Sequence, residues 1–256
     1  MKHLGTVLAM VTAATLAAGW GLEEALAQPL VATEGPAGSS DGPLNTAVVF
    51  VTLAVVPLAL ILVTSFAKIA VVFGFLRAGL GLQQVLPTSV VTALAVVLSA
   101  TIMAPVGLSM ARAADGLSID TPREAWFRRA SEVGAPLGAW LKRHAGKREV
   151  ETLTALTREL HTTQDAEQWA SPDHPLVLAT AFALTELKEA FVIGVLIVIP
   201  FLVVEVVVAN VLLSAGLQGL SPPTVSLPFK VLLFVLIDGW TLLVQGLVMG
   251  YTTPVG

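Results

Sequence analysis

Long stretches without a charged residue constrain this chain more than any other feature. No residue between Arg77 and Arg112 is charged, and none after Asp238. A helix needs about 20 apolar residues to cross the hydrocarbon core of a bilayer, and a strand leaves backbone groups unpaired in lipid. We therefore predict an all-α integral membrane protein with four long apolar helices. They are expected at about residues 46–66, 86–106, 188–212 and 229–250.

The composition supports a membrane protein and excludes several other classes. Charged residues make up 12% of the chain, whereas soluble domains carry about 25%. No basic block favours nucleic acid as a partner. The absence of cysteine excludes disulfides, thiolate metal sites and cysteine nucleophiles.

The N-terminus has the pattern of a targeting signal. Lys2 and His3 precede an apolar stretch, and Ala25-Leu26-Ala27 has the small side chains that signal peptidase prefers. We predict a cleavable signal peptide over residues 1–27, with a retained membrane helix as the alternative. Residues 28–43 are rich in Pro, Gly and Ser and are expected to form a flexible tail.

The charges then divide the chain into two membrane hairpins and an insertion. The hairpins are predicted at residues 44–106 and 181–256. Residues 107–180 hold more than half of all charged residues and are predicted to be a helical, water-facing insertion. If the signal is cleaved, Lys68 and Arg77 lie in the cytoplasm, as the positive-inside rule favours, and the insertion is periplasmic.

The insertion shows two apolar stripes at helical spacing. One comprises Trp126, Ala130, Val133, Leu137 and Trp140. We expect a new helix to begin at Pro136. The other runs from Val150 to Leu160. These faces suit either a small cap that packs on itself or a contact surface for neighbouring subunits.

Several charged residues lie within or beside the apolar segments. Such groups are costly in a membrane, so they usually pair or face a cavity. Structural pairing that fixes the assembly is favoured over ion coupling. Lys230 and Asp238 are eight residues apart and cannot touch, so each needs a partner elsewhere. The candidates are Lys68, Arg77, Glu186, Lys188, Glu189, Glu205, Lys230 and Asp238.

Four prolines lie in or beside the predicted helices, at Pro57, Pro105, Pro200 and Pro228. A proline inside a helix removes a backbone hydrogen bond and bends the helix. Such bends suit hairpins that curve around an axis. At Pro105 and Pro228 simple helix termination is the favoured alternative.

Ordered motifs around these segments resemble the FliP/SctR family of type III secretion export-apparatus proteins. The motifs are Thr64-Ser65-Phe66, Leu76-Arg77, Leu80-Gly81, Gln83-Gln84, Met103-Ala104-Pro105-Val106, Ser226-Leu227-Pro228-Phe229-Lys230 and Asp238-Gly239-Trp240. The run Lys68-Ile69-Ala70-Val71-Val72-Phe73, with Gly246-Leu247-Val248 and Tyr251, looks more like the injectisome branch than the flagellar one.

The resemblance implies a channel-forming subunit of an export gate for unfolded proteins in the bacterial inner membrane. Family members assemble as several copies with two smaller membrane proteins, forming bent hairpins raised toward the periplasm. It implies neither an enzyme nor a bound cofactor. The partners expected are therefore further copies, those two proteins, unfolded secreted proteins and membrane lipid.

The same resemblance marks a candidate seal before Pro222-Pro223. Family members usually carry a methionine-rich loop there, but this chain has none in that loop. Leu217, Gln218 and Leu220 stand nearest its place, with glycines expected to leave the backbone loose. An ordinary turn between helices is the alternative.

Two other classes were weighed against the secretion gate. An ion-coupled transporter would use the buried acids, although no inverted repeat is visible. An intramembrane protease would need histidine ligands or a second aspartate within the spans. All four histidines lie outside the predicted spans, and Asp238 is the one aspartate inside them.

Overall fold

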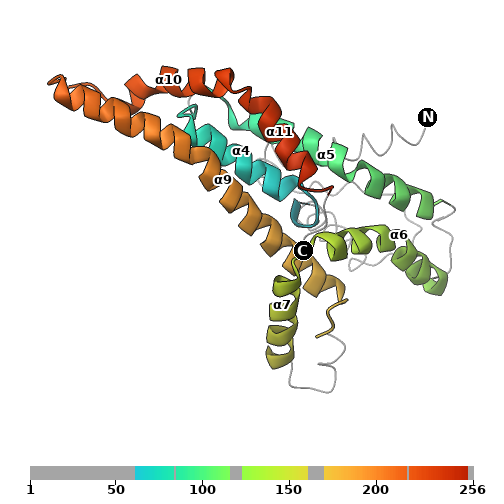
Figure 1. The fold of residues 1–256 in the computed structure, drawn as a ribbon. Helices are drawn as coiled ribbons and strands as arrows, with labels where there is room; N and C mark the ends of the chain where they lie inside the picture. Colours follow the sequence, from blue (N-terminus) through green and yellow to red (C-terminus); the bar gives the residue numbers. More distant parts are fainter. Residues whose placement is uncertain (1–60, 84, 116–122, 161–169, 218, 253–256) are drawn as a thin grey trace, which may run out of the picture. The chain divides into compact units, whose positions relative to one another are not determined.

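A computed structural model describes residues 61–83, 85–115, 123–160, 170–217 and 219–252, without the side chains of residues 123–130. Within these ranges the regular elements are all α-helices, which confirms the all-α class (Figure 1). The helices are α4 (Phe66–Gly79), α5 (Thr88–Ala113), α6 (Arg123–His144), α7 (Lys147–Leu160), α9 (Pro175–Ser214), α10 (Pro222–Leu236) and α11 (Gly239–Met249). Contacts within the chain divide it before Leu62, and these helices all belong to the unit Leu62–Gly256.

Several predictions fall outside the described residues. These are the signal peptide at 1–27, the tail at 28–43 and nearly all of the first predicted membrane helix at 46–66. The side chains of Trp126 and Ala130, which belong to the first apolar stripe of the insertion, are also outside them.

The long helix α9 organises the unit. It has 40 residues and extends well before the predicted start at residue 188. Pro175 occupies its first turn, where the missing N–H of proline costs nothing. The charged residues between 186 and 189 do not interrupt the helix, since glutamate and lysine are good helix formers, and each of them pairs with a residue on another element.

Four other helices pack on α9. Helix α4 lies along its middle and α10 along its C-terminal half, while α6 and α7 contact its N-terminal part (Figure 1). Phe75 of α4 seats its ring against Gly194, where any β-carbon would overlap that ring. Small residues at crossings let membrane helices approach closely. The main core includes Ile69, Val72, Phe73, Leu76, Ala95, Ala190, Phe201, Phe234 and Leu247.

A second, smaller core lies where the insertion meets α9. Leu141 and Ala145, at the end of α6, pack with Leu178, Ala181 and Phe182 of α9. Trp140, Val150 and Leu153 join this core, whereas Leu156 and Leu160 are exposed. The second apolar stripe is therefore only half used within the described part of the chain.

Fewer helices qualify as membrane spans than the four expected. In the described part, α5 and α9 are long and apolar enough to cross a bilayer. Helices α10 and α11 qualify only as a pair, and they are bent by 60° at a short break. The predicted helix at 229–250 is thus two helices, because Asp238 adopts a left-handed conformation with φ of 51°.

Pro105 and Pro228 do not terminate helices, which was the favoured alternative for these two prolines. Pro105 lies inside α5, Pro200 inside α9 and Pro228 inside α10. Pro136 does not begin a new helix but lies inside α6. Helices in apolar surroundings tolerate proline when other groups satisfy the freed backbone.

Candidate functional site

A buried lysine holds two carboxylates at the start of α4. The Lys68 Nζ atom lies 3.1 Å from Glu186 Oε1 and 2.6 Å from Glu189 Oε2, both on α9. Lys68 and Glu186 are almost fully buried, while Glu189 is 36% exposed. Residues 118 positions apart thus meet, and one positive charge faces two negative ones.

The C-terminal end of the described chain closes this charged group. The Tyr251 ring lies under the Lys68 ammonium, with 4.4 Å between Nζ and the ring centroid, a cation–π contact. The Tyr251 hydroxyl donates a hydrogen bond to Glu186 Oε2. Burial, and then the negative charge of Glu186, raise the pKa of Tyr251, so the phenol remains a donor.

The insertion completes the group through two aromatic residues at the end of α6. Trp140 stacks on Tyr251 with 5.6 Å between ring centroids, and its ring centroid lies 4.0 Å from that of His144. Burial, followed by the charges of Arg143 and Lys68, lowers the pKa of His144, so its imidazole is neutral near pH 7. We call Lys68, Glu186, Glu189, Tyr251, His144 and Trp140 the Lys68 cluster.

Two further contacts hold the start of α7 to α9. The backbone N–H of Gly146 donates to Thr185 Oγ1 at 2.9 Å. Lys188 Nζ lies 3.0 Å from Glu149 Oε1. The hydrogen bond from Lys188 lowers the pKa of the Glu149 carboxyl. The insertion is therefore tied to the membrane helix beside the Lys68 cluster.

The remaining predicted charges lie apart from the cluster. Lys230 on α10 pairs with Glu205 on α9. Arg77 donates to Thr88 Oγ1 at 2.9 Å and to the carbonyl oxygen of Gln83 at 2.5 Å. Asp238 precedes α11 and forms no ion pair with any described residue. A role for these residues in fixing an assembly stays a prediction.

The candidate seal lies in the turn between α9 and α10 (Figure 1). Gly216 has φ of 70°. Its N–H donates to the carbonyl oxygen of Leu213, and the N–H of Leu217 donates to the carbonyl oxygen of Leu212. This Schellman cap gives the backbone a defined course, so it is not loose at this glycine. Leu217 and Leu220 are 48% and 50% exposed, and Gln218 lies outside the described residues.

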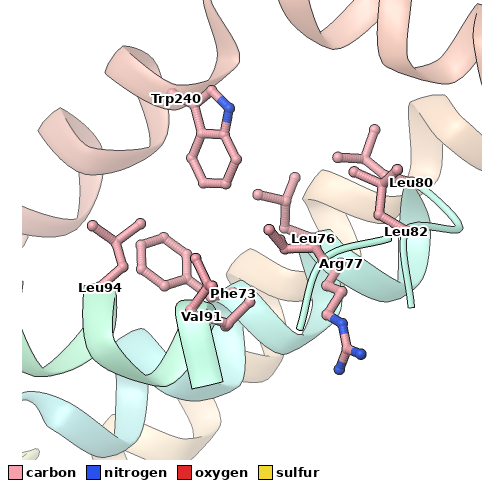
Figure 2. A pocket seen from close by; sticks show the side chains of 10 residues that line it. Phe73, Leu76, Arg77, Leu80, Leu82, Val91, Leu94 and Trp240 are labelled. Carbon is pink, nitrogen blue, oxygen red and sulfur yellow. The ribbon is translucent and has the colours of Figure 1, made fainter. Parts of the chain in front are cut away.

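An apolar cavity of about 200 Å³ lies between α4, α5 and α11. Its walls include Phe73 and Leu76 of α4, Leu94 of α5 and Trp240 of α11 (Figure 2). Arg77 is the one charged residue along its lining. Over the described residues, no three or more histidine or acidic side chains are grouped to hold a metal ion.

Sequence reasoning missed several members of this site. Trp140 was assigned only to an apolar stripe, and neither His144 nor Glu149 was singled out. Tyr251 was used only for the resemblance, although it is the single tyrosine of the chain and a hydroxyl beside an apolar span needs a partner. A second missed contact joins the buried hydroxyls of Ser65 and Ser99 at 3.0 Å.

Comparison with known proteins gives consistent results. The model of the FliP family matches residues 49–247. The chain is 41% identical to "Yop proteins translocation protein R" of Yersinia pestis, over 81% of this chain and 96% of that protein. It is 40% identical to "Hypersensitivity response secretion protein HrcR" of Ralstonia nicotianae, over 80% and 95%. It is 34% identical to "Flagellar biosynthetic protein FliP" of Caulobacter vibrioides, over 86% and 80%.

Proposed function

We propose, from the premise that this chain belongs to the FliP family, that it is a channel-forming subunit of a type III secretion export gate. The observation that carries the proposal is the family match over residues 49–247, which includes α4, α5, α9 and α10 whole. Identities of 41% and 40% to the Yersinia and Ralstonia secretion proteins, against 34% to the Caulobacter flagellar protein, favour the injectisome branch. A flagellar export gate is the alternative within the same family.

The proposed location is the bacterial inner membrane, with residues 107–180 in the periplasm as a helical insertion. In this topology 1–27 is a removable signal, 28–43 a tail, and 44–106 and 181–256 are two bent hairpins with four apolar helices in all. The apolar faces of α5 and α9, largely exposed within the single chain, support burial against lipid and neighbouring subunits.

The proposed partners are further copies of this chain and two smaller membrane proteins of the export apparatus. Exposed apolar residues on α9 support such packing, since Phe191, Leu196 and Val203 are each at least half exposed. Unfolded secreted proteins are the proposed cargo. The FliP family is a family of secretion-apparatus membrane proteins rather than of enzymes, and we assign no catalytic role or cofactor.

The proposed seal is the turn that carries Leu217, Gln218 and Leu220. A conduit for unfolded chains needs a closure that excludes ions yet yields to any sequence, so apolar side chains suit it better than a polar site. Leucine is branched and less adaptable than the unbranched methionine.

Assembly is tested by expressing the full chain with the two smaller membrane proteins and measuring the purified complex by native mass spectrometry. One defined complex with several copies of this chain and both partners is expected. A monomer or dimer, with both partners present but unbound, would contradict the export-gate proposal.

The seal is tested on that complex with the double substitution Leu217→Ser and Leu220→Ser. We expect unchanged assembly and a higher ion conductance in planar bilayers, because hydroxyl groups would let water enter the constriction. Leu160→Ser, at a side chain 79% exposed on α7, is the matched control and should leave conductance unchanged. Equal conductance in all three proteins would remove this turn from the seal.

An ion-coupled transporter remains a second candidate because the Lys68 cluster holds one more carboxylate than ammonium. Buried acids of this kind occur on ion pathways in membranes. The isolated chain in vesicles separates the two functions. A transporter would move protons or sodium ions alone, whereas a gate subunit would move neither without its partners.

A further inference from the structure

The cavity between α4, α5 and α11 has the dimensions and the lining of a site for a hydrocarbon group. Its volume is about 200 Å³. An apolar cavity of about 150 Å³ stays dry and admits small apolar molecules. Phe73, Leu76, Val91 and Trp240 line it with carbon atoms (Figure 2). Water has no polar partners there, whereas an alkyl chain matches the walls.

Two of the surrounding helices have the length and composition of membrane-crossing segments, which favours a position of this cavity beside lipid. Helix α5 is long and apolar enough to cross a membrane, and α11 is one half of the bent pair that also qualifies. The cavity is partly open, and the Trp240 side chain on its wall is 41% exposed. Tryptophan is typical of the zone where hydrocarbon meets lipid headgroups.

One end of the cavity carries a fixed positive charge. The stem of Arg77 lines the wall, and its guanidinium points away from the ring of Trp240 (Figure 2). The Thr88 hydroxyl and the Gln83 carbonyl hold this guanidinium at the turn between α4 and α5. Nε of this group is buried without a partner among the described residues, but Nη1 and Nη2 each keep a second N–H for an oxyanion, and no acidic side chain lines the cavity.

We propose that this cavity binds one anionic phospholipid, with an acyl chain among Phe73, Leu94 and Trp240 and the phosphate against Arg77. The charge favours an anionic lipid over a zwitterionic one, since an arginine near the surface attracts anionic headgroups. An apolar protein surface would fill the cavity but would gain nothing from the arginine. This function is additional to protein export and does not depend on the number of subunits.

The test uses the full chain in phosphatidylcholine vesicles that contain a small fraction of brominated lipid. Bromine quenches nearby tryptophan, and the contribution of Trp240 is the difference between the native chain and Trp240→Phe. Brominated phosphatidylglycerol should quench the Trp240 fluorescence as strongly as a roughly fivefold higher fraction of brominated phosphatidylcholine. This factor is the preference for an anionic lipid that one arginine near a membrane surface provides.

Two variants test the role of the arginine. Arg77→Gln should remove the preference for phosphatidylglycerol, while Arg77→Lys keeps the charge and should keep most of it. Lys142→Gln, at a side chain 65% exposed and far from α4 in sequence, is the control and should behave as the native chain.

Two results would overturn the proposal. Equal quenching of native Trp240 by both brominated lipids would show ordinary contact with surrounding lipid instead of a site. No quenching by either lipid would show that protein fills the cavity, either a second copy or another part of this chain. Because the vesicles contain no export partners, neither result bears on the export-gate function.

Discussion

The Lys68 cluster and the turn between α9 and α10 lie toward opposite ends of one helix and differ in almost every respect. Around Lys68, charged and aromatic groups from α4, α6, α9 and the C-terminal residues are buried against one another. At the turn, Leu217 and Leu220 are exposed. At one end each charged side chain has an oppositely charged partner within the single chain, and the other end is apolar surface without a described partner. The difference indicates a fixed base and a tip completed by assembly.

The sharpest way to break this comparison is to remove the ammonium at the base. Lys68→Met leaves Glu186 buried without its cation, and loss of one partner of a buried ion pair costs about 3–5 kcal/mol. Thermal unfolding of the full chain in detergent measures the loss. Lys142→Met removes an exposed pair with Asp173 and should cost about 0–1 kcal/mol. Similar losses in the two variants would refute the idea of a charged base.

A second test compares the Lys230–Glu205 ion pair, which lies nearer the turn between α9 and α10, with the Lys68 cluster. Lys230 is buried but its partner Glu205 is 31% exposed, so the carboxylate left by Lys230→Met can still reach water or headgroups. We expect a loss of about 2–3 kcal/mol, smaller than for Lys68→Met. The double variant with Glu205→Gln should recover part of it. A larger loss than at Lys68 would reverse the proposed order of the two ends.

A third test concerns the bend between α10 and α11, which belongs to neither end. A β-carbon on Gly239 would overlap the ring of Phe234, so Gly239→Ala should destabilise the chain by about 1–2 kcal/mol through overpacking. Gly246→Ala in the same helix meets nothing within 4 Å and should be neutral or slightly stabilising. Equal effects in unfolding experiments would mean that Phe234 moves aside without cost.

The smallest expected effect is a pH dependence of the base. Burial lowers the pKa of His144 below its ordinary value of 6.5. The unfolded chain therefore binds more protons near and below pH 6.5, and this contribution to stability is present above that pH and lost as the pH falls. In His144→Gln, the melting temperature should depend less on pH between about pH 7 and 5.5 than in the native chain. An unchanged slope of melting temperature against pH would show that the protonation of His144 does not contribute to the stability of the Lys68 cluster.

The helical class and the charged residues that need partners could be predicted from the sequence, but the residues that pair with them could not. Lys68 within an apolar run requires a countercharge, yet nothing local points to Glu186 or to Tyr251. The seal turn was located through the resemblance, but the Schellman cap at Gly216 was not foreseen. A glycine before Leu217 fits both a loose loop and a left-handed cap.

The errors in the helices have a common physical origin. Hydropathy predicted α9 from residue 188, because the charges at 186–189 look like a boundary when counted alone. The helix continues to Pro175 because glutamate and lysine are good helix formers, and these residues pair with Lys68 of α4 and Glu149 of α7. Proline breaks helices in water, which favours helix ends at Pro105 and Pro228, whereas apolar packing around α5 and α10 keeps both residues inside a helix.

The unbroken length of α9 has a mechanical consequence. From Glu186 to Ser214 the helix rises about 42 Å, and its near end is clamped by Lys68 while its far end leads into the exposed turn. If the helix tilted as a rigid rod about the Lys68 cluster, its far end would move the most. A tilt of about 10° there would displace the far end by about 7 Å, and α10, which packs along that half of the helix, would move with it.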